Sequence, residues 1–387
     1  MARKIRVGVL FGGQSSEHEV SLASARSVLR AIDREKYEVV PIGITKLGAW
    51  FTAGDPMAQL RAGVSGDMSL PAGASVIAPD PRGVGRAEIV ELVPGTNGAG
   101  QVTARVGESL DVIFPVLHGP YGEDGTVQGM LSLAGIPYVG SEVLGSAVGM
   151  DKITMKSIFR DHGLPVPPYV ATSRAEWTRD PGGVQARAER VLRYPMFAKP
   201  SNMGSSVGVS KIHGPGEFAD GLTLAARYDR RVLIEQGIDG RECECAVLGN
   251  DEPRASVVGE IVPGNEFYDY RAKYVDDNSE LVIPAEIPDR LMEEIRGLSI
   301  EAFKALDCAG MARVDFFVER DLSRVWLNEL NTIPGFTRIS MYPKLWEASG
   351  IGYSELIDRL IELALERHED RQVSKKALED VGSNLDV

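Results

Sequence analysis

The first fifty residues combine short apolar runs with one segment of helical periodicity. The run IRVGVLF at 5–11 is almost continuously apolar, as expected of a strand buried on both faces of a parallel sheet. In VSLASARSVLRAI at 20–32 the apolar residues recur on one helix face, and YEVVPIGI at 37–44 reads as a second strand. This strand–helix–strand order predicts a doubly wound parallel-sheet domain at the N-terminus.

The rest of the chain alternates strand-like runs with helical segments, which predicts two further α+β units. Residues 51–108 are rich in Gly, Ala and Pro, and we expect them to extend the first domain with short strands at SVIAP and AEIVELV. A last helix is expected over 353–367, because the charged segment after it lacks an apolar face. The predicted fold class is α/β (α+β), with an N-terminal domain over 1–140, a central unit over 141–234, a C-terminal unit over 235–370 and a mobile tail over 371–387.

Composition and charge are typical of a globular protein whose main partner is not nucleic acid. The chain has 387 residues, and its formal net charge of −13 lacks the basic footprint that phosphate backbones require. No apolar stretch is long enough to span a bilayer, and the N-terminal apolar run is too short for a secretory signal. Three cysteines without framework spacing suggest a reducing cytoplasm, and Cys243 and Cys245 fit strand residues better than half of a zinc site.

An acidic hairpin is the most informative stretch for chemistry. In ARVDFFVERDLSRVWLNELN, Arg313 and Asp315 share one strand face, as do Glu329 and Asn331. With a turn near Leu322, Asp315 lies opposite Glu329, where Cβ atoms are about 4.5–5.5 Å apart. Such oxygen ligands suit Mg²⁺. The alternative is a solvated face, which is weakened by the apolar residues expected on the opposite face: Val314, Phe316, Val318, Trp326 and Leu330.

A glycine-rich loop follows a lysine in FAKPSNMGSSVGVSKI. Lys199 precedes a turn in which the backbone N–H groups of Gly204, Ser205, Ser206 and Gly208 are available to phosphate oxygens. From these residues alone, a phosphate cradle and an ordinary flexible hairpin remain equally good interpretations.

Further candidates lie near the predicted strand ends. Glu17 follows the first strand, where ligands of doubly wound sheets bind, and it either pairs with an ammonium group or stabilises a helix N-terminus. His118 follows the second buried strand and would face the same crevice. Lys152 in GMDKITMK is a phosphate contact or a surface lysine, and EFYDYRAKY at 266–274 is a lid or a packing loop.

Together these stretches resemble the D-alanine–D-alanine ligases of the ATP-grasp superfamily. Eight motifs carry the resemblance in family order between about residues 5 and 345. They are LFGGQSSEHEVSL, LHGPYGEDGTVQGML, GMDKITMK, KPSNMGSSVGVSK, VLIEQGIDGRECECAVL, FYDYRAKY, GMARVDFFV and NELNTIPGFTRIS. The resemblance implies a three-domain ATP-grasp architecture with ATP between the central and C-terminal units.

The resemblance also implies a role for individual residues. ATP would be held by Lys152, Lys199, Ser205, Ser206, Glu235, Gln236, Ile238, Glu242 and Lys273. Mg²⁺ or Mn²⁺, as two ions, would be held by Asp315, Glu329 and Asn331. Glu17 would bind the ammonium of the first D-alanine, with Ser205 and Tyr274 as its partners. Arg313 and the N–H of Gly335 would meet the oxyanion, and Ser340 would meet the second carboxylate. His118 and Met341 would be further substrate contacts.

The implied reaction is ATP-dependent joining of two D-alanine molecules through a D-alanyl phosphate, for peptidoglycan precursors, by a cytoplasmic homodimer. In D-alanine–D-lactate ligases the last tyrosine of YDYRAKY is absent, so Tyr274 favours the dipeptide. A regulatory nucleotide-binding protein, which the intact metal trio disfavours, and a related carboxylate–amine ligase are the two remaining hypotheses. Met203 departs from the family pattern, since some members carry an acidic residue there.

Overall fold

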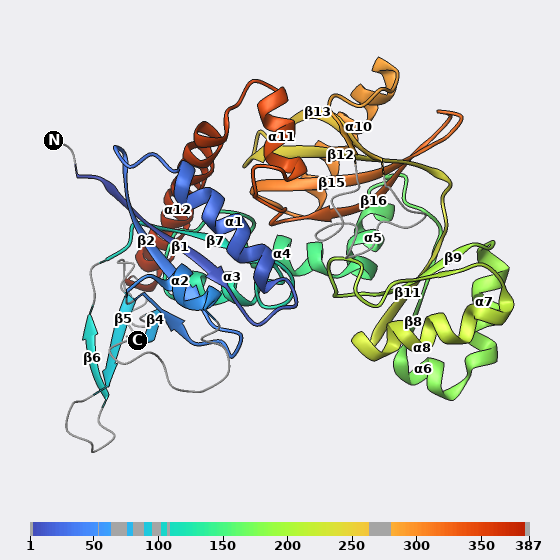
Figure 1. Cartoon of the computed structure of the whole chain (residues 1–387), viewed down its shortest axis with the longest axis horizontal. Helices are drawn as coiled ribbons and strands as arrows, with labels where there is room; N and C mark the ends of the chain where they lie inside the picture. The colour runs from blue at the N-terminus through green and yellow to red at the C-terminus, as the bar shows by residue number, and fades with distance from the viewer. Residues whose placement is uncertain are drawn as a thin grey trace.

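The computed structural model contains three β-sheets that follow one another along the chain (Figure 1). It describes residues 3–52, 54–62, 76–79, 89–94, 102–106, 109–262 and 280–383. The N-terminal sheet lies at the left of Figure 1, the central sheet at the lower right and the C-terminal sheet at the upper right. The sheets occur in the order of the three predicted domains, whose boundaries stay a prediction.

The N-terminal sheet has a parallel core and an antiparallel extension. Its strand order is β6-β5-β4-β3-β2-β1-β7, and β1, β2 and β7 pair in parallel as predicted. The short strands expected within 51–108 are present and add antiparallel pairs to this core. The strands are β1 Ile5–Gly12, β2 Tyr37–Ile44, β3 Trp50–Phe51, β4 Val76–Pro79, β5 Ile89–Pro94, β6 Val102–Val106 and β7 Val112–Val116.

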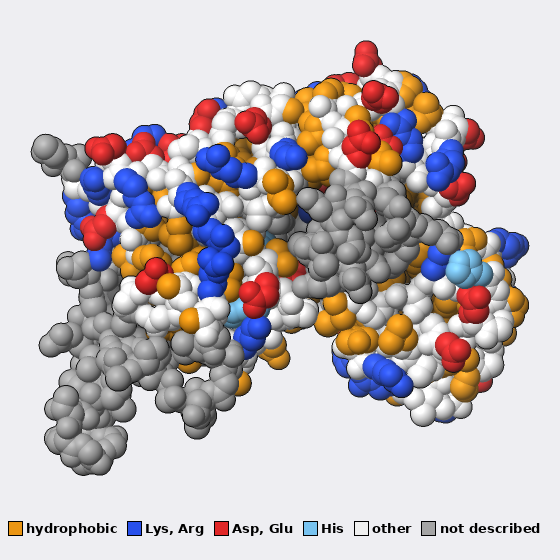
Figure 2. All heavy atoms as spheres, in the orientation of Figure 1, with side chains coloured by type: hydrophobic (Ala, Val, Ile, Leu, Met, Phe, Trp, Pro, Cys, Tyr) orange, Lys and Arg blue, Asp and Glu red, His pale blue; other side chains and the backbone are white. Residues whose placement is uncertain are grey.

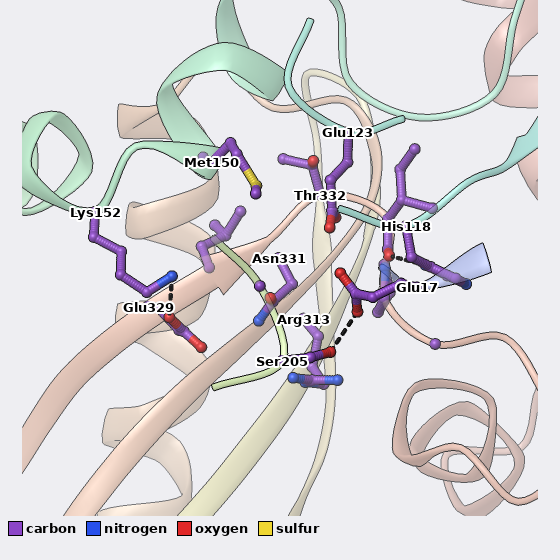
Figure 3. Close-up of a pocket in the computed structure, with 16 residues that line it drawn as sticks. Glu17, His118, Glu123, Met150, Lys152, Ser205, Arg313, Glu329, Asn331 and Thr332 are labelled. Atoms are coloured by element: carbon purple, nitrogen blue, oxygen red, sulfur yellow. Dashed lines mark hydrogen bonds and ion pairs between the residues drawn. The ribbon is translucent and has the colours of Figure 1, made fainter. Parts of the chain in front are cut away.

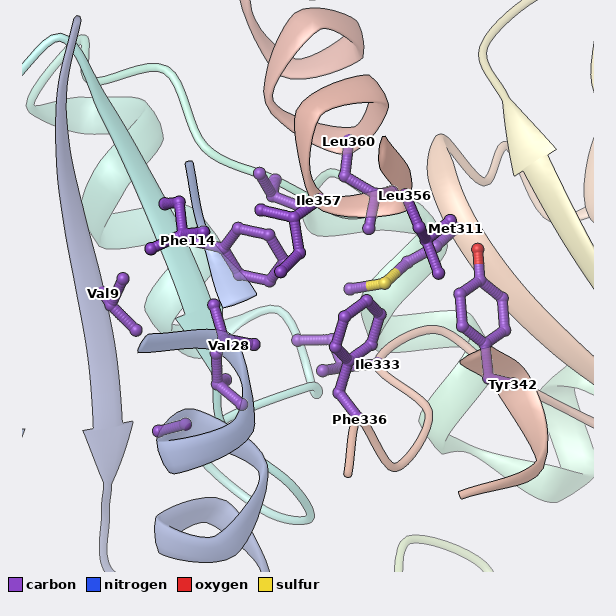
Figure 4. Packing of buried hydrophobic residues seen from close by; sticks show 14 of the residues in the cluster. Val9, Val28, Phe114, Met311, Ile333, Phe336, Tyr342, Leu356, Ile357 and Leu360 are labelled. Atoms are coloured by element: carbon purple, nitrogen blue, oxygen red, sulfur yellow. The ribbon is translucent and has the colours of Figure 1, made fainter. Parts of the chain in front are cut away.

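Helices cover both faces of the parallel core, as its continuously apolar strands require. One face packs against α1 (His18–Ala31) and α12 (Tyr353–Ser383), and the other against α3 (Thr126–Leu133). Figure 4 shows Phe114 of β7 beside Ile357 of α12, with Phe336 close by. The end of the chain is therefore part of the N-terminal core, which joins the first and last predicted units through apolar packing.

The last helix is longer than the apolar pattern predicts. The expected end at 367 is wrong, because α12 continues to Ser383. Two arginines compensate for the missing apolar face: Arg367 donates to the carbonyl oxygen of Tyr138 at 2.7 Å, and Arg371 donates to Glu142 at 2.9 Å. These contacts attach the stretch of α12 around Arg367 and Arg371 to the segment before α4.

The central sheet is antiparallel and carries helices on one face. Its order is β10-β9-β11-β8, and α7 and α8 pack over it through a cluster that includes Val184, Leu222 and Ile234. Lys199 of β9 and Glu235 of β11 lie on the opposite face. The elements are β8 Tyr169–Ser173, β9 Met196–Pro200, β10 Ser210–Ile212, β11 Arg231–Gln236, α6 Arg174–Arg179, α7 Pro181–Val191 and α8 Phe218–Tyr228.

The C-terminal sheet is also antiparallel and carries the acidic hairpin. Its order is β14-β13-β12-β15-β16, and α10 packs on the face that bears Val314 and Phe316. Cys243 and Cys245 are buried in this core as free thiols, in agreement with strand residues. The elements are β12 Gly240–Gly249, β13 Arg254–Val262, β14 Glu280–Val282, β15 Gly310–Glu319, β16 Val325–Asn331, α10 Asp289–Ala305 and α11 Met341–Ala348.

The pairing of β15 with β16 shifts by one residue at Asn328. Asp315 pairs with Glu329, whereas Phe317 pairs with Trp326, so the register skips Asn328. A bulge of this kind reverses the alternation of side chains along a strand. The prediction that Trp326 lies on the apolar face is therefore wrong, while the predicted pairing of the two acidic residues is confirmed.

Two short helices connect the N-terminal sheet to the others. They are α4 (Val143–Met150) and α5 (Lys152–Asp161), and α5 lies between the central and C-terminal sheets in Figure 1. A third short helix, α2 (Pro56–Arg61), packs near β2. On the face shown in Figure 2, basic side chains form a narrow band over the N-terminal part, and both signs of charge are intermixed over the C-terminal part. In the part of the chain that the structure describes, no helix is long and apolar enough to cross a membrane.

Candidate active site

Residues from all three parts of the chain line one pocket (Figure 3). The N-terminal part contributes the ends of β1 and β7, α5 and the loop after β9 contribute the second wall, and β15 and β16 contribute the third. Its charged and polar lining residues include Glu17, His118, Glu123, Lys152, Ser205, Arg313, Glu329 and Asn331. Seven of these residues are predicted candidates, and they come together from distant parts of the sequence.

Glu17 lies immediately before α1 and points into this pocket. Its side chain is buried, and its Oε1 accepts a hydrogen bond from the Ser205 hydroxyl at 2.5 Å. A Cβ atom on Gly119 would lie 2.6 Å from Glu17 Oε2, and one on Gly204 would lie 2.7 Å from it. Both neighbouring loops can approach the carboxylate this closely only because they carry glycine there.

The loop after β9 has an unusual backbone. Ser205 and Ser206 have φ angles of 50° and 59°, and Gly208 has 73°, all in the left-handed region. Non-glycine residues hold this conformation at a cost, and the surrounding structure must fix it. The contact with Glu17 is one such restraint, and it turns the Ser205 hydroxyl toward the N-terminal part of the pocket.

His118 is buried between two polar partners. One ring nitrogen lies 3.0 Å from the Ile333 carbonyl oxygen, and the other lies 3.1 Å from the Ser24 hydroxyl. Burial lowers the pKa of His118 below its ordinary value, against the raising effect of the Glu17 charge. The ring is therefore neutral at pH 7. Its two contacts connect the loop that leads to Gly335 with α1.

Glu123 is a pocket residue that the sequence motifs did not single out. Its Oε1 accepts a hydrogen bond from the Gly119 N–H at 2.7 Å. Burial, and then the nearby charge of Glu17, raise the pKa of Glu123 to about 8. The residue stands in the stretch HGPYGEDG, so its place after a buried strand was the available signal.

The acidic hairpin contributes Arg313, Glu329 and Asn331 to the pocket lining, and Asp315 is paired with Glu329. Arg313 donates to both carboxylate oxygens of Asp315, at 2.7 and 2.8 Å, and also pairs with Glu244 at 2.9 Å. The Asn331 amide donates to Asp315 at 3.0 Å. Asp315 and Glu329 are directly paired across the strands. Arg313 is thus fixed by two carboxylates next to the predicted metal ligands.

The donor set fits a hard cation such as Mg²⁺. It offers two carboxylates and one amide oxygen on a single sheet face, which are the ligand types that Mg²⁺ takes. Among the described residues, no group of three or more His, Cys, Asp and Glu side chains could hold a metal ion. An ion here would therefore need further oxygen ligands, and Mg²⁺ usually obtains them from water and substrate phosphates.

Lys152 connects the hairpin with the glycine-rich loop. Its ammonium lies 3.3 Å from Glu329 Oε2 (Figure 3). It also donates to the Met203 carbonyl oxygen at 3.0 Å. Asp151 caps the helix by accepting from the Thr154 N–H at 2.8 Å, which fixes Lys152 in the first turn of α5. At Met203, the position that departs from the family pattern, the backbone carbonyl makes this contact.

Lys199 lies on the strand before the same loop. Its ammonium pairs with Glu235 Oε2 at 2.7 Å, and Glu235 Oε1 pairs with Lys156 at 2.5 Å. Burial alone would lower the pKa of Lys199, but Glu235 and Glu329 raise it overall. Lys199 therefore carries a positive charge at pH 7.

Comparison with known proteins shows to which family the chain belongs. The family model described as D-ala D-ala ligase N-terminus matches residues 6–141, and the one described as D-ala D-ala ligase C-terminus matches residues 158–362. This chain belongs to the D-alanine–D-alanine ligase family. A D-alanine–D-alanine ligase of Acetivibrio thermocellus is 52% identical over 375 residues, which cover 96% of this chain and 98% of the relative.

Solved structures agree with the ATP-grasp fold of this family. The D-alanine–D-alanine ligase from Coxiella burnetii superimposes with a TM-score of 0.80 at 36% identity, over 99% of this chain and 100% of that one. The VanG D-Ala:D-Ser ligase from Enterococcus faecalis gives a TM-score of 0.80 at 35% identity, over 94% of this chain and 100% of that one. The predicted family and the predicted fold class are confirmed.

The residues predicted for adenine and ribose lie at the end of β11 and beyond it. The Glu235 carboxylate faces the two lysines, and the Gln236 amide exchanges hydrogen bonds with the backbone of Arg193 at 2.7 and 2.9 Å. Ile238 and Glu242 are half-buried. Because the side chains of Glu235 and Gln236 are engaged in these contacts, the backbone groups at the end of β11 are available to the base of a nucleotide.

Ser340, predicted for the second carboxylate, lies directly before α11, and Met341, a further predicted substrate contact, is the first residue of that helix. The Ser340 hydroxyl accepts from the Thr337 N–H at 3.1 Å, and a Cβ on Gly335 would lie 3.1 Å from it. Met341 packs in the hydrophobic core. Gly335 lines the pocket. The predicted lid residues Lys273 and Tyr274 lie outside the described residues.

Proposed function

We propose that this chain joins two D-alanine molecules to D-alanyl-D-alanine with ATP, for peptidoglycan precursor synthesis. The observation that carries the proposal is the convergence of Glu17, Arg313 and Glu329 on one pocket, with Asp315 paired to Glu329, in a chain of this family. A carboxylate suits an amino-acid ammonium, an arginine suits an oxyanion, and paired acids suit a phosphate-bound cation.

The chemistry needs two steps that balance. A carboxylate oxygen of the first D-alanine attacks the γ-phosphorus of ATP, and ADP leaves, which gives D-alanyl phosphate. The amine of the second D-alanine then attacks the acyl carbon; phosphate leaves with the former carboxylate oxygen, and the amine loses a proton. Bound Mg²⁺ would neutralise charge on the phosphates, held by Asp315, Glu329 and Asn331.

The protein's own residues would bind and orient these reactants. Lys152 and Lys199 would hold phosphate oxygens, together with backbone N–H groups around Ser206. Glu17 would bind the first ammonium. Arg313 and the N–H of Gly335 would stabilise the tetrahedral oxyanion, a contribution whose removal typically costs about 10²–10³-fold in rate.

A D-alanine–D-serine ligase is the second candidate. The solved D-Ala:D-Ser ligase has the same fold and covers 94% of this chain. Purified protein with ATP, Mg²⁺ and D-alanine should release ADP and form D-alanyl-D-alanine, identified by mass spectrometry. Reactions with added D-serine, D-lactate or L-alanine should contain D-alanyl-D-alanine as the main product. A mixed product that exceeds the dipeptide at neutral pH would reject the assignment.

We also propose a cytoplasmic homodimer. The cytoplasm supplies ATP, and a reducing compartment suits the three buried free cysteines. The dimer follows from the family resemblance. Sedimentation equilibrium should give twice the mass of the chain, and a monomer at the concentration of the assay would contradict the dimer.

A further inference from the structure

A second lysine of α5 is buried beside the proposed ATP site. Lys156 lies one turn after Lys152, and only 1% of its side chain is exposed. Its ammonium lies 2.5 Å from Glu235 Oε1 and donates to the Asn328 carbonyl oxygen at 2.5 Å. A buried ammonium requires such partners, because removing its hydration is costly.

Glu235 is shared between two lysines. Its Oε1 faces Lys156, and its Oε2 faces Lys199 at 2.7 Å. Burial alone would raise the pKa of Glu235, but Lys156 and Lys199 lower it overall, so the group is a carboxylate at pH 7. Burial lowers the pKa of Lys156, against the raising effect of the Glu235 charge. With both lysines protonated, the three groups carry a net charge of about +1. A Lys199–Glu235 pair without Lys156 would be neutral.

The sharing of Glu235 between two lysines affects how strongly Lys199 can attract an anion. An ammonium fully paired with one carboxylate presents little net field to a phosphate a few ångströms away, and in a buried site such charges are weakly screened. Lys156 is too buried to touch a ligand itself. Lys156 neutralises part of the negative charge of Glu235. Lys199 is thereby left with positive charge that no carboxylate offsets.

Lys156 also contacts the bulge of β16. The Asn328 carbonyl that accepts its hydrogen bond belongs to the residue skipped by the strand register. Loss of this contact leaves a buried carbonyl with one partner fewer, which is expected to lower stability. This structural role is separate from the electrostatic one, and the two can be measured separately.

We propose that Lys156 is a positioning residue for ATP, which keeps Lys199 cationic toward the phosphates by sharing the carboxylate of Glu235. The inference rests on the proposed function, in which Lys199 meets ATP. It assigns a role to a residue with no direct access to the ligand. The role is electrostatic, so it depends on the charge of Lys156 and of Glu235 together.

The first test replaces Lys156 by a neutral side chain of similar length. In Lys156→Met, Lys199 and Glu235 form a neutral pair, so the Kd of a non-hydrolysable ATP analogue with Mg²⁺, measured by calorimetry, should rise by roughly 10–100-fold. KM for ATP should rise in step, while KM for D-alanine stays within about threefold. Lys304→Met, at an exposed position of α10, removes the same charge far from the pocket and should bind like the unmodified protein.

The second test removes both charges. In Lys156→Met with Glu235→Gln, no carboxylate competes for Lys199. Because Glu235 is itself a predicted ATP contact, the reference is Glu235→Gln alone, and adding Lys156→Met to it should leave the Kd of the analogue within about threefold. Replacing a buried ion pair by neutral groups is often tolerated, so this comparison is informative even if Lys156→Met does not fold. Loss of the contact with the Asn328 carbonyl should lower thermal stability in both backgrounds, but Lys156→Met should weaken analogue binding only where Glu235 is present.

Two results would overturn the proposal. One is unchanged analogue binding in folded Lys156→Met. The other is a further loss of at least about tenfold in analogue affinity when Lys156→Met is added to Glu235→Gln, because a purely structural role predicts the same cost in both backgrounds. Calorimetry needs no turnover, so these outcomes are independent of whether the unmodified protein forms D-alanyl-D-alanine, which is measured first.

Discussion

The Glu17 carboxylate and the Ser205 hydroxyl lie 2.5 Å apart although 188 positions separate them in the chain. Glu17 belongs to the N-terminal part, and Ser205 belongs to the loop proposed to hold ATP phosphates. A residue proposed to bind the amino acid is therefore hydrogen-bonded to the loop proposed to bind the nucleotide. Both residues line one pocket, so the two proposed substrate sites are adjacent.

The charge of Glu17 should set the affinity for D-alanine. Hydrogen bonds to charged groups typically contribute about 1.5–3 kcal/mol, so Glu17→Gln should raise KM for the first D-alanine by roughly 10–100-fold. Glu19→Gln is the matched control, since Glu19 is exposed in the first turn of α1, two residues after Glu17, and pairs with Lys46. Steady-state kinetics of ADP release check this, and equal KM values in the two variants would rule out the ammonium-binding role.

Glu329 should affect turnover more than nucleotide binding. In Glu329→Gln the cation site loses one of its two carboxylates, so the rate should fall by roughly 10²–10³-fold and the Mg²⁺ concentration for half activity should rise. Calorimetry should still detect binding of the ATP analogue. Unchanged turnover at low Mg²⁺ would show that Glu329 does not hold the ion.

The raised pKa of Glu123 should make stability fall as the pH rises. The folded protein keeps this proton up to about pH 8, whereas the unfolded chain releases it near the ordinary value of 4.5. Between these values the folded state binds more protons, so raising the pH lowers the free energy of unfolding. Glu123→Gln removes this dependence because the amide does not titrate.

Urea unfolding of both proteins between about pH 5 and 9 measures this difference. The stability of Glu123→Gln relative to the unmodified protein should increase with pH and level off above about pH 8. Parallel pH profiles would mean that Glu123 is ionised in the folded protein at neutral pH.

Strand alternation was sufficient to predict part of the site. The positions of Asp315 and Glu329 follow from the side-chain period of two and a turn near Leu322, and the structure pairs them directly. The same rule fails for Trp326, because no local pattern marks the bulge at Asn328. Periodicity thus predicts regular pairing and misses its interruptions.

Burial of charged residues could not be predicted in the same way. In GMDKITMK, Lys156 resembles an exposed helix lysine, and its burial depends on Asn328, 172 positions away. Glu123 acquires its raised pKa from burial and from the charge of Glu17, against the lowering effect of the hydrogen bond from the Gly119 N–H. Tertiary contacts create both environments, and neither has a local sequence signature.

The end of the chain offers a test of stability that is independent of catalysis. Arg367 has 13% of its side chain exposed and donates to the carbonyls of Tyr138 and Gly140, whereas Arg371 is 47% exposed. Arg367→Met should lower the free energy of unfolding by about 1–3 kcal/mol, and Arg371→Met by less than about 1 kcal/mol. Equal losses would contradict the view that Arg367 fastens α12 to the N-terminal part.

The most direct test of the proposed reaction follows the oxygen atoms of D-alanine. D-Alanine labelled with ¹⁸O in both carboxylate oxygens is incubated with the protein, ATP and Mg²⁺, and the products are analysed by mass spectrometry. An acyl phosphate transfers one carboxylate oxygen to phosphate, so each phosphate should contain one ¹⁸O and each D-alanyl-D-alanine should contain three. Unlabelled phosphate formed together with the dipeptide would contradict the proposed mechanism.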